Sequence, residues 1–138
     1  MICATYQLCS LIDTIYSIFS TGEYKEILNV INGNQILNFR NNTGETLIHA
    51  ILKNKTSELT ETKILDIIQK LVLKNVSINA MNEYNQTGLH LASQRGFYEI
   101  IDYFISLKSD FNKIDNYGNG PLHYLIDNFV FSFFYLII

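Results

Sequence analysis

The sequence contains very little cysteine, and this excludes the folds that depend on it. Cys3 and Cys9 are the only cysteines among 138 residues, and they lie six positions apart near the N-terminus. Neither belongs to a spacing pattern that supplies the four ligands of a structural zinc site. We therefore predict two buried or unreactive thiols in a reducing compartment, and no metal.

Positive charge is also scarce. Ten Lys and Arg residues stand against 13 Asp and Glu, which gives a net charge of −3 and a pI near 5.5. A protein that binds DNA or RNA needs clustered basic side chains to displace counterions from phosphates. No nucleic-acid partner is expected.

Long apolar runs and targeting signals are missing as well. The apolar N-terminal stretch has no basic leader and contains Asp13, unlike a signal peptide. The most apolar stretch begins at Phe129 and closes at Ile138. Ten residues of helix span about 15 Å, half of a hydrocarbon core of about 30 Å. We expect an intracellular, cytoplasmic protein that does not span a membrane.

Catalytic and cofactor motifs are absent too. The sequence has no Gly-rich dinucleotide loop, P-loop, nucleophile elbow or His-Glu-x-x-His pattern. Glu58 and Glu61 form an acidic pair in a polar stretch, which is typical of a solvated face. We predict no enzyme and no cofactor, although motifs do not test for a site assembled from distant residues.

What the sequence does have is a motif that recurs. Thr87 begins the run Thr-Gly-Leu-His-Leu-Ala, which contains His90, and a Gly at 96 follows. The same pattern surrounds His123, 33 residues later, and His49, 41 residues earlier, with an Asn eleven residues before each histidine. A period of this length indicates stacked repeats, because one helix pair cannot bury its apolar face alone.

These residues resemble the ankyrin repeat, with Gly88 in place of the proline in the Thr-Pro-Leu-His-x-Ala signature. The resemblance implies an all-α solenoid of about four repeats, each a helix-turn-helix pair linked to the next by a β-hairpin loop. The divisions are residues 1–37, a degenerate repeat or cap; 38–78, a repeat with an insertion near 53–62; 79–111, a repeat; and 112–138, an incomplete repeat with an apolar end. The polar insertion should lengthen a loop or helix without touching the core.

The flanks and turns carry weaker signals. In residues 4–19, apolar side chains recur three and four apart on one predicted helix face, namely Leu8, Leu11, Ile12, Ile15, Ile18 and Phe19. A short helix over 23–31 should follow.

Asn75 and Lys108 replace the glycine that usually ends the second helix, so we expect strain or an altered turn at Lys108. Gly120 lacks the threonine hydroxyl, and residues 132–138 should form a second helix without a polar face.

The resemblance also implies a non-enzymatic scaffold that binds a protein partner through hairpin tips and the inner-helix face. The predicted tip positions are Arg40, Asn42, Thr43 and Glu45, then Met81, Glu83, Tyr84 and Gln86, then Ile114, Asn116, Tyr117 and Asn119. The predicted inner-face positions are Lys53, Asn54, Gln94, Arg95, Asp127 and Asn128. Tyr and Arg dominate binding hot spots, which favours Tyr84, Tyr117 and Arg95.

The three histidines invite a metal site, but distance argues against it. Stacked helices lie roughly 8–10 Å apart, whereas zinc holds each ligand nitrogen at about 2.1 Å. His49, His90 and His123 should instead bond to nearby backbone or to a threonine hydroxyl. An alternative role for the chain stays open: it is a fragment of a longer array whose apolar end, from Phe129 onward, mediates self-association or docks on a membrane surface.

Overall fold

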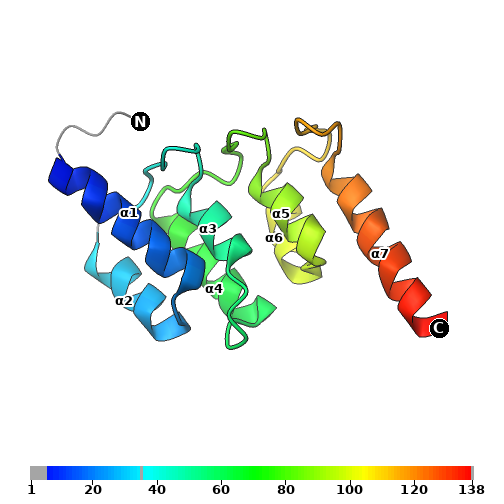
Figure 1. Ribbon diagram of the computed structural model, residues 1–138, viewed down its shortest axis with the longest axis horizontal. Coiled ribbons are helices and arrows are strands. Elements are labelled where there is room, and N and C mark those ends of the chain that lie inside the picture. The colour runs from blue at the N-terminus through cyan, green and yellow to red at the C-terminus, as the bar shows by residue number, and fades with distance from the viewer. Residues whose placement is uncertain (1–5, 35, 138) are drawn as a thin grey trace.

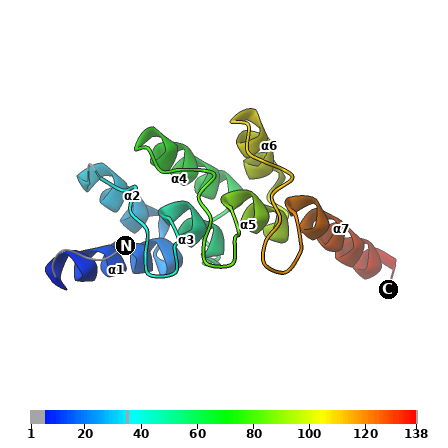
Figure 2. The same cartoon turned by 90° about the horizontal axis from the view of Figure 1, so that it is seen from above.

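The computed structural model describes residues 6–34 and 36–137, and within them the chain is all α-helical. The helices are α1 (Tyr6–Thr21), α2 (Tyr24–Gly33), α3 (Leu47–Lys53), α4 (Glu61–Leu73), α5 (Gly88–Arg95), α6 (Tyr98–Ser106) and α7 (Pro121–Ile137). They form two layers, an inner one of α1, α3, α5 and α7 and an outer one of α2, α4 and α6 (Figures 1 and 2). This confirms the predicted solenoid of helix pairs.

The core lies between the two layers and runs along the array. Its largest fully buried side chains alternate between inner and outer helices, because each helix turns one apolar stripe toward its partner. They include Phe19 on α1, Ile27 on α2, Ile48, Ile51 and Leu52 on α3, Ile64, Ile67, Ile68 and Leu71 on α4, and Phe104 on α6. At Gly88, a Cβ would lie 3.1 Å from Ile48 and 3.3 Å from Phe104, so glycine allows α5 to pack closely where the repeat pattern has proline.

The turns after α4 and α6 keep the geometry of the missing glycine. Asn75 has φ of 64° and Lys108 has φ of 62°, both in the left-handed region. Val76 N donates to Leu71 O at 3.1 Å, and Ser109 N donates to Phe104 O at 3.0 Å. These bonds satisfy carbonyls at the helix ends. The strain predicted at Lys108 is therefore present, and the turn itself is not altered.

The loops that precede α3, α5 and α7 are tight hairpin turns, although no β-strand forms within the described residues. Asn41, Asn82 and Asp115 occupy one equivalent position in these loops. The Asn82 side-chain oxygen accepts hydrogen bonds from Tyr84 N and Gln86 N, each at 3.0 Å, and the other two make the same pair of bonds. An Asx side chain thus fixes each tip.

The insertion near residues 53–62 does lengthen a loop, but the prediction that it avoids the core is wrong. Leu59 is 5% exposed and belongs to the core, and Asn54 is fully buried. The Asn54 amide donates to Phe19 O and Gly22 O, each at 3.1 Å. The loop is consequently fastened to the end of α1.

The helix predicted in residues 4–19 is confirmed, within the described residues, as α1. It packs through Ile12, Ile15 and Phe19, while Leu8 and Leu11 near its start are 42% and 52% exposed. The prediction for the C-terminal end is wrong. Residues 132–138 do not start a new helix: α7 continues without a break to Ile137. None of the described helices is both long and apolar enough to cross a membrane.

The cysteine prediction is wrong for Cys9, which is disulfide-bonded in the structure, and Cys3 lies outside the described residues. The intracellular location stays a prediction, as do the divisions between repeats, each of which falls in a loop.

Candidate functional site

A groove of about 540 Å³ opens on the inner-helix face between α3 and α5. Its lining combines aliphatic side chains at its floor with cationic and amide groups at its rim. The lining residues are Leu52, Lys53, Lys55, Gln86, Leu91, Gln94 and Arg95. Two neighbouring repeats build this groove together.

Lys53 stands at the rim of the groove, and its positive charge is partly balanced by a neighbouring carboxylate. Its ammonium forms an ion pair with Glu45, whose side chain is buried and also accepts a hydrogen bond from Tyr16. Burial lowers the pKa of Lys53, and the nearby charge of Glu83 acts in the opposite direction. Glu45 therefore belongs to the framework that holds Lys53 and is not an open tip position.

Arg95 is also tied to the framework. Its guanidinium donates to the Asn54 and Leu52 carbonyl oxygens, at 2.6 and 3.1 Å, and lies over the Phe97 ring at 4.3 Å. Burial lowers its pKa. The side chain is half-buried, so it forms one wall of the groove while it holds the end of α3.

Gln86 is the predicted tip residue that the structure removes from the surface. Its side chain is 8% exposed, with its amide nitrogen 3.4 Å from Asp115 and its amide oxygen 3.4 Å from Asn82. Its carbonyl oxygen lies 2.9 Å from His49 Nε2. Gln86 therefore lines the groove but offers a partner little side-chain surface.

The hairpin tips stand side by side and are joined by backbone bonds. Glu83 N donates to Thr43 O, and Asn116 N donates to Tyr84 O, both at 2.9 Å. The rings of Tyr84 and Tyr117 stack with centroids 6.1 Å apart, and they are 42% and 65% exposed. The tips therefore form one continuous ledge that ends in an exposed aromatic pair.

The other predicted contact residues fall into two groups. Arg40, Asn42, Glu83, Gln94 and Asn116 are exposed, while Thr43, Met81 and Asn119 are half-buried. Arg40 reaches Met81 O at 3.4 Å and Asn116 is bonded to Glu83 O at 3.1 Å, so part of the ledge is braced across repeats.

The histidines have the structural role that was predicted for them. His49 Nδ1 accepts from Thr46 N at 3.1 Å, and His90 Nδ1 accepts from Thr87 N at 3.1 Å. His123 Nδ1 accepts from Gly120 N at 3.0 Å, without a hydroxyl beside it. Within the described part of the chain, no group of His, Cys, Asp and Glu could hold a metal ion.

A family model described as ankyrin repeats (3 copies) matches residues 59–135, which is more than half of the chain. This chain belongs to the ankyrin-repeat family. It is also 30% identical over 66 residues to a protein of fowlpox virus (strain NVSL) that is named as an ankyrin repeat protein. The match covers 48% of this chain and 35% of that relative, so the chain spans about a third of the relative's length.

In this ankyrin-repeat chain, sequence reasoning missed three of the groove residues. Leu52 and Leu91 read as ordinary core positions of the inner helices, and Lys55 lies in the insertion, which the repeat pattern does not describe. The insertion is the signal that could have found Lys55, because extra residues after an inner helix are expected to border the inner face. Asn128, predicted as a contact, instead donates to Ser93 O at 3.0 Å and Gln94 O at 2.7 Å.

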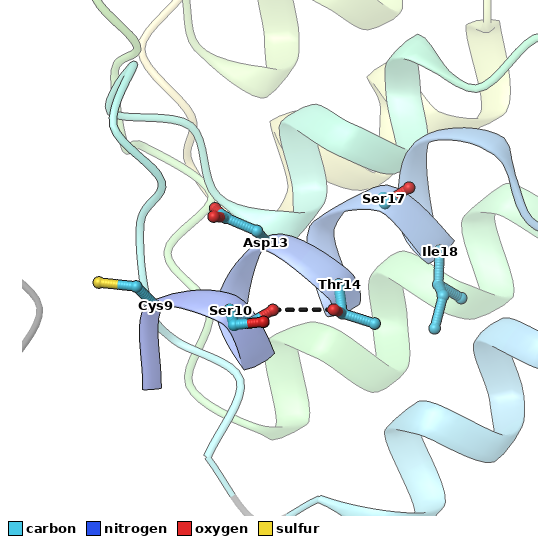
Figure 3. Close-up of a pocket in the computed structure, with 6 residues that line it drawn as sticks. All are labelled: Cys9, Ser10, Asp13, Thr14, Ser17 and Ile18. Atoms are coloured by element: carbon cyan, nitrogen blue, oxygen red, sulfur yellow. Dashed lines mark hydrogen bonds between the residues drawn. The ribbon is translucent and has the colours of Figure 1, made fainter. Parts of the chain in front are cut away.

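A second hollow of about 430 Å³ lies along α1 of the ankyrin array and is lined by Cys9, Ser10, Asp13, Thr14, Ser17 and Ile18 (Figure 3). The Thr14 hydroxyl donates to Ser10 O at 2.8 Å, within the same helix. The hollow is open and carries a single carboxylate, so it offers no chemistry comparable to the groove between α3 and α5.

Proposed function

We propose that this ankyrin-repeat chain is a non-enzymatic scaffold that binds a protein partner across the groove between α3 and α5 and the ledge of hairpin tips beside it. Ankyrin repeats generally mediate protein–protein interaction. The observation that carries the proposal for this face is the groove itself, since its apolar floor and polar rim lie on the inner-helix face beside the hairpin tips.

The composition of the face supports a peptide-like partner segment with carboxylate side chains. The groove is lined by Lys53, Lys55 and Arg95 and by no carboxylate, and because Lys53 is already paired with Glu45, Lys55 and Arg95 supply most of its positive charge. Next to it, Tyr84 and Tyr117 supply rigid aromatic area that can be covered at little cost in side-chain entropy. The partner would lie along the inner face and contact the aromatic pair.

The experiment is affinity capture from a cell lysate with three forms of the chain. The test variant carries Tyr84→Ala, Tyr117→Ala and Lys55→Glu; the control carries Tyr98→Ala and Lys25→Glu, which change an exposed aromatic and an exposed lysine on the outer helices. Arg95 is left intact because its loss would disturb α3.

A protein held by the intact chain and by the control, and lost by the test variant, would support the proposal. Its release by salt would be expected if carboxylates meet the basic rim. Equal capture by all three forms, each shown to be folded by circular dichroism, would place the contact elsewhere on the molecule and overturn the proposed face.

A further inference from the structure

The second half of α7 extends beyond the rest of the array (Figures 1 and 2). α5, the helix it packs against, has 8 residues, whereas α7 has 17. Pro121 is buried, and Asn128 is bonded to the last carbonyls of α5. From Phe129 onward, every described residue is exposed. Two turns of helix that are almost entirely apolar thus face solvent. A helix that is apolar on all sides is normally buried, because it is not stable by itself in water.

One stripe along α7 has the spacing of a coiled-coil seam. It is made by Leu122, Ile126, Phe129, Phe133 and Leu136, which follow one another in steps of four, three, four and three residues. These five side chains are 53–86% exposed. Apolar residues in this rhythm pack against a second helix over the whole length of the contact. The stripe, here called the α7 seam, therefore fits a helix of matching length and character.

The charge of α7 argues against a lipid surface as the occupant. Helices that lie in a membrane interface carry Lys or Arg on a polar face. α7 contains neither, and its one charged side chain is the carboxylate of Asp127. An uncharged, aromatic-rich seam is instead complementary to itself, because no like charges are brought together along it.

The exposed area is also of the right size for a pair of identical chains. The seam together with the adjoining Val130 and Ile137 offers seven apolar side chains that are 45–86% exposed. At somewhat under 200 Å² for each whole side chain, this is on the order of 700 Å² per copy. Stable protein–protein interfaces bury about 800 Å² on each partner.

We propose that two copies of this chain associate through their α7 seams, in a symmetric pair. A symmetric contact of this kind closes on itself and does not grow into fibres. None of the seam residues lines the groove between α3 and α5. The proposed dimer can therefore be tested independently of the proposed function.

The test is the mass of the chain in solution over a range of concentrations, by sedimentation equilibrium. The intact chain is expected to be a dimer that dissociates on dilution. Phe129→Glu with Phe133→Glu should weaken association on the order of a hundred-fold or more, because two carboxylates per copy would be buried in the contact. The matched control, Leu73→Glu with Ile114→Glu, adds the same charge at exposed apolar positions off the seam, at 83% and 58% exposure, and should remain a dimer.

A monomer at every concentration overturns the proposal, as does a dimer that survives the two seam substitutions while circular dichroism shows a folded chain. Binding of the monomeric chain to uncharged phosphatidylcholine vesicles, lost in the seam variant, would assign the seam to lipid and overturn it as well.

Discussion

The guanidinium of Arg95 on α5 lies 2.6 Å from the carbonyl oxygen of Asn54, in the preceding repeat. The last carbonyls of a helix have no partner within the helix, and α3 ends at Lys53. Arg95 supplies the missing donors, at Asn54 and at Leu52. A side chain that by the repeat pattern should face a partner thus closes the end of a neighbouring helix.

Replacement of Arg95 should therefore cost stability before it affects binding. We expect Arg95→Ala to lower the free energy of unfolding by about 1–3 kcal/mol, because two carbonyls lose a charged donor. Urea denaturation followed by circular dichroism measures the change. Gln94→Ala, at an exposed neighbouring position, should stay within about 0.5 kcal/mol. Equal small effects at both positions would mean that Arg95 does not hold α3.

Asn54 fastens the insertion to the N-terminal helix, so its replacement should lower the free energy of unfolding although it lies in a polar stretch of the sequence. Asn54→Ala leaves the carbonyls of Phe19 and Gly22 without their donor in a buried place. We expect a loss of about 2–3 kcal/mol in unfolding free energy. The control is Lys55→Ala, one residue on and exposed. A loss below about 1 kcal/mol at Asn54 would show that water replaces the amide.

The sequence allowed the repeat framework to be predicted because that framework depends on local chemistry. Thr87 and His90 are three residues apart and meet within one helical turn, and the same holds for Thr46 and His49. Such contacts recur wherever the motif recurs. The helix pairs and the role of the histidines could therefore be predicted without a structure.

The features that sequence reasoning missed depend on contacts between distant residues. Gln86 is buried because Asp115, 29 residues away, accepts from its amide. Leu59 reaches the core because Asn54 ties the insertion to α1. α7 continues as one helix because nothing in its sequence stops it: residues 129–138 contain neither Gly nor Pro. The repeat period predicted a turn there that local chemistry does not supply.

Gly120 offers a way to strengthen the last repeat. A Cβ at this position would lie 3.5 Å from Lys113 O and 3.6 Å from His123 Nδ1, in ordinary contact. Gly120→Thr should place a hydroxyl beside His123, as Thr46 and Thr87 do beside their histidines at 3.0 and 2.9 Å. The hydroxyl and the reduced freedom of the unfolded chain should together raise the free energy of unfolding by about 0.5–1 kcal/mol. The melting temperature should rise by a few degrees.

Gly120→Ala separates the two contributions to that gain. It restricts the unfolded chain in the same way but brings no hydroxyl, and alanine is a poor residue at a helix N-cap. Its melting temperature should therefore lie below that of Gly120→Thr. If the two variants melt together, the hydroxyl does not reach His123, and the last repeat does not close its entrance as the earlier repeats do.

The pH dependence of stability should report on His49 and His90. In both, Nδ1 accepts from a backbone N–H, at Thr46 and at Thr87, so the folded chain needs the neutral ring with its proton on Nε2. Burial lowers the pKa of both rings below the ordinary value of 6.5. When the pH falls below about 6.5, the two rings therefore become protonated in the unfolded chain while they stay neutral in the folded chain.

Stability should accordingly be complete above pH 6.5 and decline as the pH is lowered toward 5, a range in which most carboxylates are still ionised. The free energy of unfolding can fall by about 1.4 kcal/mol per pH unit for each histidine. Urea midpoints measured between pH 7.5 and 5 test this, and His49→Gln should start from a lower stability but show a shallower decline. A midpoint that does not move over this range would mean that both rings accept a proton in the folded chain, which the two N–H donors facing Nδ1 oppose.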